Sequence, residues 1–368
     1  MITKIQQDNK EDSIELLRII CMIWIISGHI CGFVSMDYLM GKNVSLNYLV
    51  DLFCFIGGDI ANNIFFLIMG YNLIEKNFKI KRILKIWYKC FFYSVLSWMI
   101  LFAFNNEMFT LENIFAMLLP IANNTWWFAS TYIVILLIAP IINKLVYESD
   151  KKDVYKYVVI MLLIFAAFSI FLSWLRDSNY IYISAIVYMI GGMIKKYKIR
   201  AKVNCIHICA CLGGVTLISA PILSRLNQNP LMFIWGPFKI PMIILGIFIF
   251  LGIVGSNIHI SKWVKYFSIS VFEVYLLHNG PLLSLIVELF GIDKVSHNSM
   301  IYPFLILSSS VLIFVFGSII AHIRMLLFHK MNKEKLEVVI IDKMEKLVER
   351  ASTFSINIFF WLFKYKKE

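Results

Sequence analysis

Long runs of apolar residues dominate the pattern of hydrophobic and polar positions along the chain. A helix needs about 20 consecutive apolar residues to cross the hydrocarbon layer of a bilayer. The strict alternation of apolar and polar positions that predicts a membrane barrel does not occur in these runs. We therefore predict an all-α, polytopic transmembrane helical bundle of about ten spans, over residues 14–35, 47–74, 83–104, 126–147, 155–175, 180–196, 203–223, 231–255, 268–290 and 301–328.

The composition excludes a soluble protein. Of the 368 residues, 60% are hydrophobic and 16% are charged, whereas soluble domains have roughly 45–50% and 25%. A soluble fold cannot keep that much apolar surface from water. We expect an inner N-terminal segment over 1–13, a membrane domain over 14–329 and a basic amphipathic tail over 330–368. The tail either lies on the anionic inner leaflet or packs on the protein's own inner face.

The distribution of positive charge predicts the orientation of the chain. With both termini inside, the inner segments hold 18 Lys and Arg residues and the outer loops hold four, namely Lys42, Arg176, Arg225 and Lys294. Cytoplasmic loops of membrane proteins collect Lys and Arg. Both termini are therefore predicted to be inside. The same rule explains the net charge of +12 without a nucleic-acid partner.

One cluster of metal-ligand residue types lies in the seventh predicted span, at Cys205, His207, Cys209 and Cys211. Residues two apart on a helix project about 200° apart, so their side chains do not converge on one ion. Cysteines within apolar runs usually behave as small apolar side chains. We therefore expect no metal site.

Ionisable side chains in the first span need a reason, because a charge at bilayer depth costs at least about 2.5 kcal/mol. Arg18 and His29 are separated by three helical turns plus about 20°, so they share one face about 16 Å apart. Glu15 lies one turn before Arg18 and is placed to pair with it. Imidazole is the usual general base near neutral pH, which makes His29 a candidate base. The alternative is an interfacial arginine and a histidine that only braces neighbouring helices.

The ninth span carries a second histidine at a comparable depth. His278 is followed by Gly280 and Pro281, which free backbone carbonyls that are tolerated only beside protein or a wet cavity. We therefore expect His29 and His278 to share one buried polar chamber. Glu273 lies about 140° around the helix from His278, so we expect it to face a cation on another helix.

Further polar and aromatic positions have two interpretations each. Asp59, Asn62 and Asn63 lie in the second span, where asparagines commonly hydrogen-bond between helices. Trp126 and Trp127 are typical of a membrane boundary, although such rings also stack on sugars. A cluster of cations that marks an inner loop, and would also hold a polyphosphate, lies at Lys79, Lys81, Arg82 and Lys85.

Five short patterns together resemble the acyltransferase 3 family of bacterial membrane O-acyltransferases, over roughly residues 12–329. The sharpest is an arginine, ten residues and a histidine, here Arg18 and His29. The others are Phe65 to Tyr71, Lys81-Arg82-Ile-Leu-Lys85, Trp127-Phe128 with Tyr132 and Pro140 to Asn143, and the series Ser268, Ser270, Phe272, Tyr275, Leu276 and His278. The chain departs from the family pattern at Met69, Lys85 and Glu273, where serine, arginine and a small residue are usual.

The resemblance implies an enzyme of the bacterial inner membrane that moves an acyl group, usually acetyl from acetyl-CoA, to a hydroxyl of a glycan. It implies that His29 is the general base, or else a carrier that is itself acylated, and that His278 orients the second substrate or accepts the relayed group. The CoA donor would bind Arg18, Lys81, Arg82 and Lys85. Further candidates for acceptor binding or support are Glu15, Asp59, Tyr71, Trp127, Tyr132, Glu273, Tyr275 and Asn279.

Two other classes of membrane protein fit the same spans. A proton-coupled transporter or flippase of a lipid-linked sugar would use the buried histidines to carry protons. Transporters often show repeated halves, and the chain has no internal repeat. A polysaccharide polymerase would usually need a large outer loop, whereas the longest expected here, about residues 105–125, is short.

Overall fold

The computed structural model describes residues 2–41, 44–167, 179–256, 258–330 and 333–362, and all regular structure in these ranges is helical. The all-helical bundle is therefore confirmed, whereas the count of ten spans and the orientation stay predictions. Six helices are long and apolar enough to cross a membrane: residues 11–34 of α1 (Ile2–Val34), α3 (Leu46–Leu73), α4 (Ile80–Phe104), α6 (Trp127–Glu148), α10 (Cys205–Arg225) and residues 302–328 of α15 (Tyr302–Lys330).

The other four predicted spans differ from long continuous helices. Two of them are the shorter helices α9 (Asn179–Lys196) and α11 (Ile240–Val254). The fifth begins as α7 (Lys151–Leu162) and a π-helical turn (Leu163–Ala167), and its remainder lies outside the described residues. The ninth is divided into α12 (Lys262–Ser268), α13 (Val271–His278), a 3₁₀ turn (Gly280–Leu282) and α14 (Leu283–Leu289).

The break after α13 follows from its sequence. Gly280 has a φ of +75°, a conformation that glycine adopts without steric cost, and Pro281 has no N–H to continue the helix. The Gly280 N–H donates to Oδ1 of Asn279 at 2.8 Å. The carbonyl of Asn279 accepts from Nε1 of Trp126 at 3.2 Å. Trp126 is fully buried, so it does not face lipid as a belt residue would. It satisfies a backbone group that the break frees.

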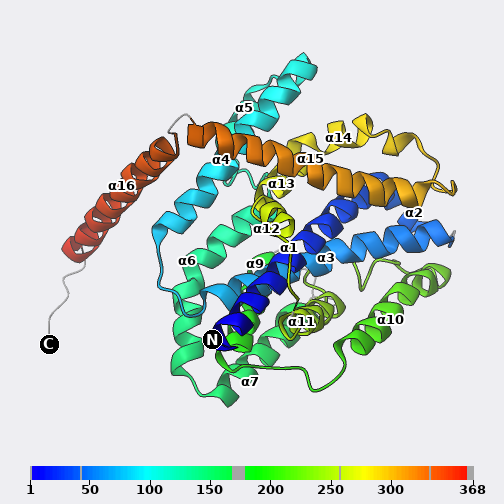
Figure 1. Cartoon of the computed structure of the whole chain (residues 1–368), viewed down its shortest axis with the longest axis horizontal. Coiled ribbons are helices and arrows are strands. Elements are labelled where there is room, and N and C mark those ends of the chain that lie inside the picture. Colours follow the sequence, from blue (N-terminus) through cyan, green and yellow to red (C-terminus); the bar gives the residue numbers. More distant parts are fainter. Residues whose placement is uncertain (1, 42–43, 168–178, 257, 331–332, 363–368) are drawn as a thin grey trace.

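Helix α3 lies in the middle of the bundle, packed against α1 on one side and α9 on another (Figure 1). Glycines allow these helices to approach closely, as small residues do in membrane bundles. A β-carbon at Gly70 would lie 1.8 Å from the carbonyl oxygen of Tyr188, and one at Gly191 would lie 2.2 Å from that of Leu67. Backbone therefore touches backbone where α3 meets α9.

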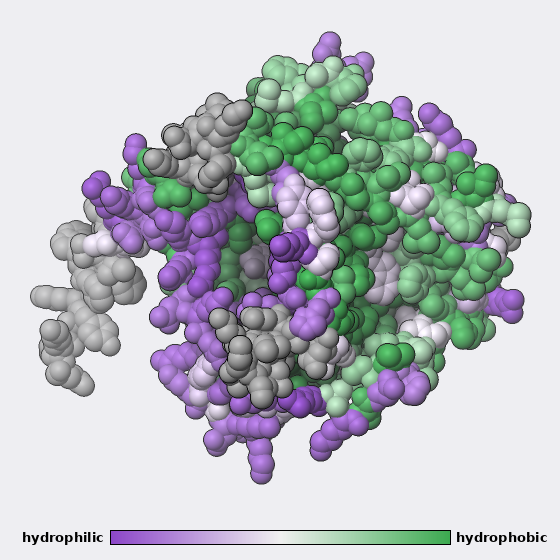
Figure 2. Space-filling view, viewed as in Figure 1, coloured by the Kyte–Doolittle hydropathy of each residue, from purple (hydrophilic) through white to green (hydrophobic). Residues whose placement is uncertain are grey.

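The remaining helices surround this centre. Helix α11 packs on α3, with α10 outside it, while α15 contacts α1 and α13. The last helix, α16 (Lys333–Leu362), extends from the edge of the bundle and contacts α4 and α15. This contact fits the alternative of a tail packed on the protein. Figure 2 shows hydrophilic side chains gathered on one side around a hollow, and hydrophobic side chains over most of the rest of this face.

Candidate functional site

The structure brings together the two histidines that the sequence places at similar depth. His29 lies on α1 and His278 is the last residue of α13. Nδ1 of His29 is 3.0 Å from Nε2 of His278, and the ring centroids are 5.2 Å apart. His278 is 1% exposed, whereas His29 is only half-buried. The pair therefore joins two helices, and His29 is the less buried of the two residues.

The hydrogen bonds determine which nitrogen of each imidazole carries a hydrogen. Nδ1 of His278 is 2.8 Å from the carbonyl oxygen of Val274, which only accepts, so this nitrogen carries a hydrogen. In the neutral ring, Nε2 of His278 is then an acceptor, and Nδ1 of His29 donates to it. Nε2 of His29 keeps a free lone pair. A basic nitrogen oriented through its other ring nitrogen is the arrangement that general-base histidines use.

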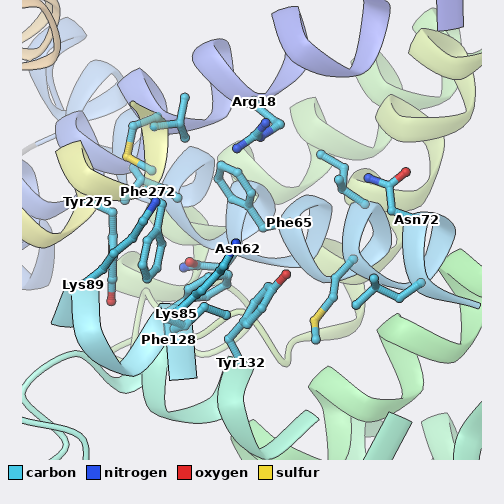
Figure 3. Close-up of a pocket in the computed structure, with 17 residues that line it drawn as sticks. Arg18, Asn62, Phe65, Asn72, Lys85, Lys89, Phe128, Tyr132, Phe272 and Tyr275 are labelled. Carbon is cyan, nitrogen blue, oxygen red and sulfur yellow. The ribbon is translucent and has the colours of Figure 1, made fainter. Parts of the chain in front are cut away.

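A cavity of about 440 Å³ lies beside the pair, between α1, α3, α4, α6 and α13. Figure 3 shows Arg18 reaching into it from α1, opposite Tyr132. The walls are mostly apolar, and no Asp or Glu is among the described residues that form them. The lining consists of Arg18, Met22, Ile25, Asn62, Phe65, Ile68, Met69, Asn72, Leu73, Lys85, Ile86, Lys89, Phe128, Tyr132, Val271, Phe272 and Tyr275.

The cavity ends one helical turn short of the histidines. Ile25 lines it four residues before His29 on α1, and Tyr275 lines it three residues before His278 on α13. The Tyr275 ring lies 6.0 Å from the His278 ring and 5.7 Å from that of Phe128. A ligand that fills the cavity would therefore meet Tyr275 and Phe128 at the end nearest the imidazoles.

Three cations reach the cavity, and two of them are already paired. Arg18 binds both carboxylate oxygens of Glu15 at 2.8 and 3.0 Å, so the pairing that the spacing predicts is present. Lys89 binds Glu273 at 2.6 Å. Lys85 has no ion-pair partner among the described residues. The cavity therefore has a positive wall whose countercharges lie outside its lining, a suitable environment for an anion.

The other two cations proposed for donor binding point elsewhere. Lys81 binds Asp342 of α16 at 2.5 Å and does not line the cavity. Arg82 donates to the carbonyl of Asn77 at 2.8 Å and lines a small neighbouring cavity with Asn143. Of the predicted basic cluster, only Lys85 reaches the large cavity.

The remaining candidates divide into residues that line the cavity and residues that hold helices together. Tyr132 and Tyr275 line it. Asn279 caps the turn after α13, as described above. The others serve packing: Asp59 accepts from the N–H of Gly236 at 2.9 Å, Tyr71 packs on Phe250 with Lys195 over its ring, and Trp127 packs on Phe128 and Tyr180.

The two asparagines of α3 have different environments. Asn63 donates to the carbonyl of Pro237 at 2.6 Å, so it links α3 to the segment that precedes α11 rather than to a helix. Asn62, which was also expected to hydrogen-bond between helices, lines the cavity instead. The Asn62 amide is therefore a polar group on a cavity wall whose other α3 residues nearby are Phe65 and Ile68.

Glu273 faces cations on other helices, as its position on the helix predicts. It binds Lys89 of α4 and, at 3.3 Å, Arg324 of α15. Neither cation was predicted from the sequence. The available signal was a charged residue inside each predicted apolar span, and Lys89 also lies one turn after Lys85 on the same face of α4. In the described residues no three His, Cys, Asp or Glu side chains are grouped to hold a metal.

Comparison with known proteins identifies the family of the chain. A model of the acyltransferase domain matches residues 11–322, which includes both histidines and every lining residue of the cavity. No curated protein and no solved structure matches the chain. The family match covers most of the chain and agrees with the resemblance carried by Arg18 and His29. The protein therefore belongs to the acyltransferase 3 family of membrane acyltransferases.

Proposed function

We propose that the protein transfers an acyl group, most simply acetyl, from an acyl-CoA donor at the inner side of the membrane to a hydroxyl of a surface glycan or its precursor. The observation that carries the proposal is the pair of histidines one helical turn beyond the end of a cavity with a positive wall. Family membership supports acyl transfer in general. The donor and the acceptor are those that the family resemblance implies, and the cavity and the histidine pair support the roles proposed for the residues.

His29 acts as the general base in this proposal. The acceptor hydroxyl gives its proton to Nε2 of His29 while its oxygen attacks the thioester carbonyl carbon. The C–O bond forms, the C–S bond breaks, and the CoA thiolate takes the proton from the imidazolium. Ester and free thiol are released, and His29 returns to its starting state. His278 keeps Nδ1 of His29 protonated and the ring in place, which supports a positioning role.

The cavity supports binding of the donor. CoA carries several phosphate charges and a long, less polar arm that ends in the thioester. Arg18 and Lys85 supply charge for the phosphates, and guanidinium groups bind such oxygens in a planar fork. Arg18 lies about 16 Å along α1 from His29. We therefore assign the phosphates of the donor to the Arg18 end of α1 and its reacting carbonyl to the His29 end.

Acyl transfer in membrane vesicles tests the proposal. With radiolabelled acetyl-CoA, we expect His29→Ala to lower label in glycan at least about 1,000-fold, because a general base and its positioning are lost together. The matched control is His207→Ala, an exposed histidine of α10, which should retain wild-type activity. Normal transfer by a folded His29→Ala protein would rule out His29 as the base.

A second experiment separates the base from the acylated carrier. Nε2 of His29 is also placed to attack a thioester itself, forming an acyl-imidazole. Donor alone, followed by rapid acid quench and peptide mass analysis, would then leave an acyl group on His29. We expect none, with label reaching product only when acceptor is present. An acyl group on the His29 peptide would show that His29 is the acyl carrier and not the general base.

A further inference from the structure

A buried cluster of three charges forms the part of the cavity wall between α4 and α13. Oε1 of Glu273 accepts from Nζ of Lys89 at 2.6 Å and from Nη2 of Arg324 at 3.3 Å. Glu273 is 1% exposed and the side chain of Arg324 is 9% exposed, but that of Lys89 is 29% exposed and lines the cavity. The three side chains come from three helices, and only the lysine faces the open space.

The cluster holds one negative and two positive charges. Oε2 of Glu273 and Nε of Arg324 are buried and have no hydrogen-bond partner in the described structure. A buried charge that is left without a partner destabilises the folded protein. Arg324 is stabilised in part by the rings of Phe92, Tyr93 and Phe328, which lie 5.5–5.6 Å from its guanidinium carbon. The excess positive charge therefore reaches the cavity through Lys89.

Lys89 also continues a row of cations along α4. Arg82, Lys85 and Lys89 are spaced three and four residues apart, so they follow one face of the helix. Lys85 and Lys89 line the cavity together with Arg18 from α1. Lys89 is the deepest of the row, about 6 Å along the axis beyond Lys85. It can therefore reach a negatively charged part of a ligand that lies further along the cavity than Lys85 reaches.

We propose that Lys89 is a further donor-binding residue and that Glu273, fixed by Arg324, is its positioning residue. This inference rests on the proposed function. Glu273 holds the ammonium group of Lys89 at the wall while the cavity is empty. When the donor binds, a phosphate oxygen of the donor contacts the same ammonium group. Because both anions compete for one ammonium group, Glu273 weakens donor binding while it keeps Lys89 in place.

The test uses the purified full chain in neutral detergent and free CoA as the probe, with affinity measured by calorimetry. We expect Lys89→Met to weaken CoA binding about tenfold, because one charge-assisted contact is lost. Lys89→Arg should stay within about threefold of wild type. The control is Lys144→Met, a lysine whose side chain is 71% exposed and outside the cavity, which should bind CoA as wild type does.

Glu273→Gln distinguishes this role from a structural one. If Glu273 acts through Lys89, the substitution strengthens CoA binding about threefold, and it has no effect on affinity in a Lys89→Met background. A merely structural cluster would instead lose thermal stability with unchanged affinity. In kinetics, Lys89→Met should raise KM for the donor and leave kcat and the acceptor KM within twofold. If Glu273→Gln does not fold, the Lys89 variants alone decide.

Two outcomes overturn the inference in different ways. CoA binding by wild type that Lys89→Met leaves unchanged would remove Lys89 from the donor site and leave the proposed function intact. Failure of wild type to bind CoA would overturn the donor assignment and this inference with it. Phosphatidylglycerol is added as a competitor, because its phosphate offers the same chemistry. A Lys89 effect on lipid but not on CoA would assign the site to a lipid headgroup and also overturn the proposal.

Discussion

The end of α13 and the middle of α15 each hold a buried histidine, and the two differ in one contact. In both His278 and His322, Nδ1 lies 2.8 or 2.7 Å from the carbonyl oxygen four residues earlier. Nε2 of His278 then meets His29 at 3.0 Å, whereas the ring of His322 stacks on Tyr266 with centroids 3.7 Å apart. The backbone bond fixes a ring in both places. Only at His278 does the second nitrogen meet another imidazole, so only this ring is placed to orient His29.

The largest expected effect in this comparison comes from removing the ring of His278, with removal of the His322 ring as the matched control. His278→Ala leaves Nδ1 of His29 without its acceptor, so we expect kcat for acyl transfer to fall about 100-fold. His322→Ala, the same change in the same backbone setting, should lower kcat less than threefold. The assay is transfer from labelled donor in vesicles, at equal amounts of folded protein. Equal losses in the two variants would remove the distinction and make His278 a packing residue.

Arg18→Ala is expected to have a smaller effect, on donor binding. The guanidinium lines the cavity but lies far from the imidazoles, so we expect KM for the donor to rise about tenfold and KM for the acceptor to change less than twofold. Steady-state kinetics with each substrate varied in turn gives both values. Arg225→Ala, at the exposed end of α10, is the control. A parallel rise in both KM values would move Arg18 into a structural role.

Trp126→Phe is expected to have the smallest effect, on stability. The substitution keeps an aromatic ring but removes the N–H that reaches the Asn279 carbonyl, at a cost of about 1 kcal/mol. The middle of α15 needs no such support, because the helix is continuous through His322. Thermal melting in detergent measures the loss, with Trp235→Phe, 51% exposed, as the control. Identical melting of both variants would show that the break after α13 does not depend on Trp126.

Helical spacing within one segment was a good guide to the site. The eleven-residue interval between Arg18 and His29 predicted that the two side chains share one helix face. In the structure Arg18 lines the cavity and His29 lies beyond its end. The three-residue interval between Glu15 and Arg18 predicted their ion pair. The angle between Glu273 and His278 predicted a cation from another helix. Such relations depend only on the geometry of one helix, so the sequence contains them.

Relations between helices could not be read in the same way. The spacing on α13 required a cation for Glu273 but did not identify Lys89 and Arg324, because packing decides which faces meet. Lys81 is a cation of the kind that binds anionic ligands, yet it forms an ion pair with Asp342 of α16. Gly280 and Pro281 predicted free carbonyls after His278, but the sequence did not identify Trp126, at the start of α6, as the donor to one of them.

Gly70 and Gly191 limit how the cavity adapts to ligands of different size. Where two backbones touch there are no side chains to rearrange, and closely packed interiors resist continuous deformation. The wall that α3 supplies is therefore stiff. In the apolar window of α4 only 28% of the residues are buried, against 78% for α3. If the donor is a thioester, as proposed, we expect space for a bulkier acyl group to come from an outward shift of α4 rather than of α3.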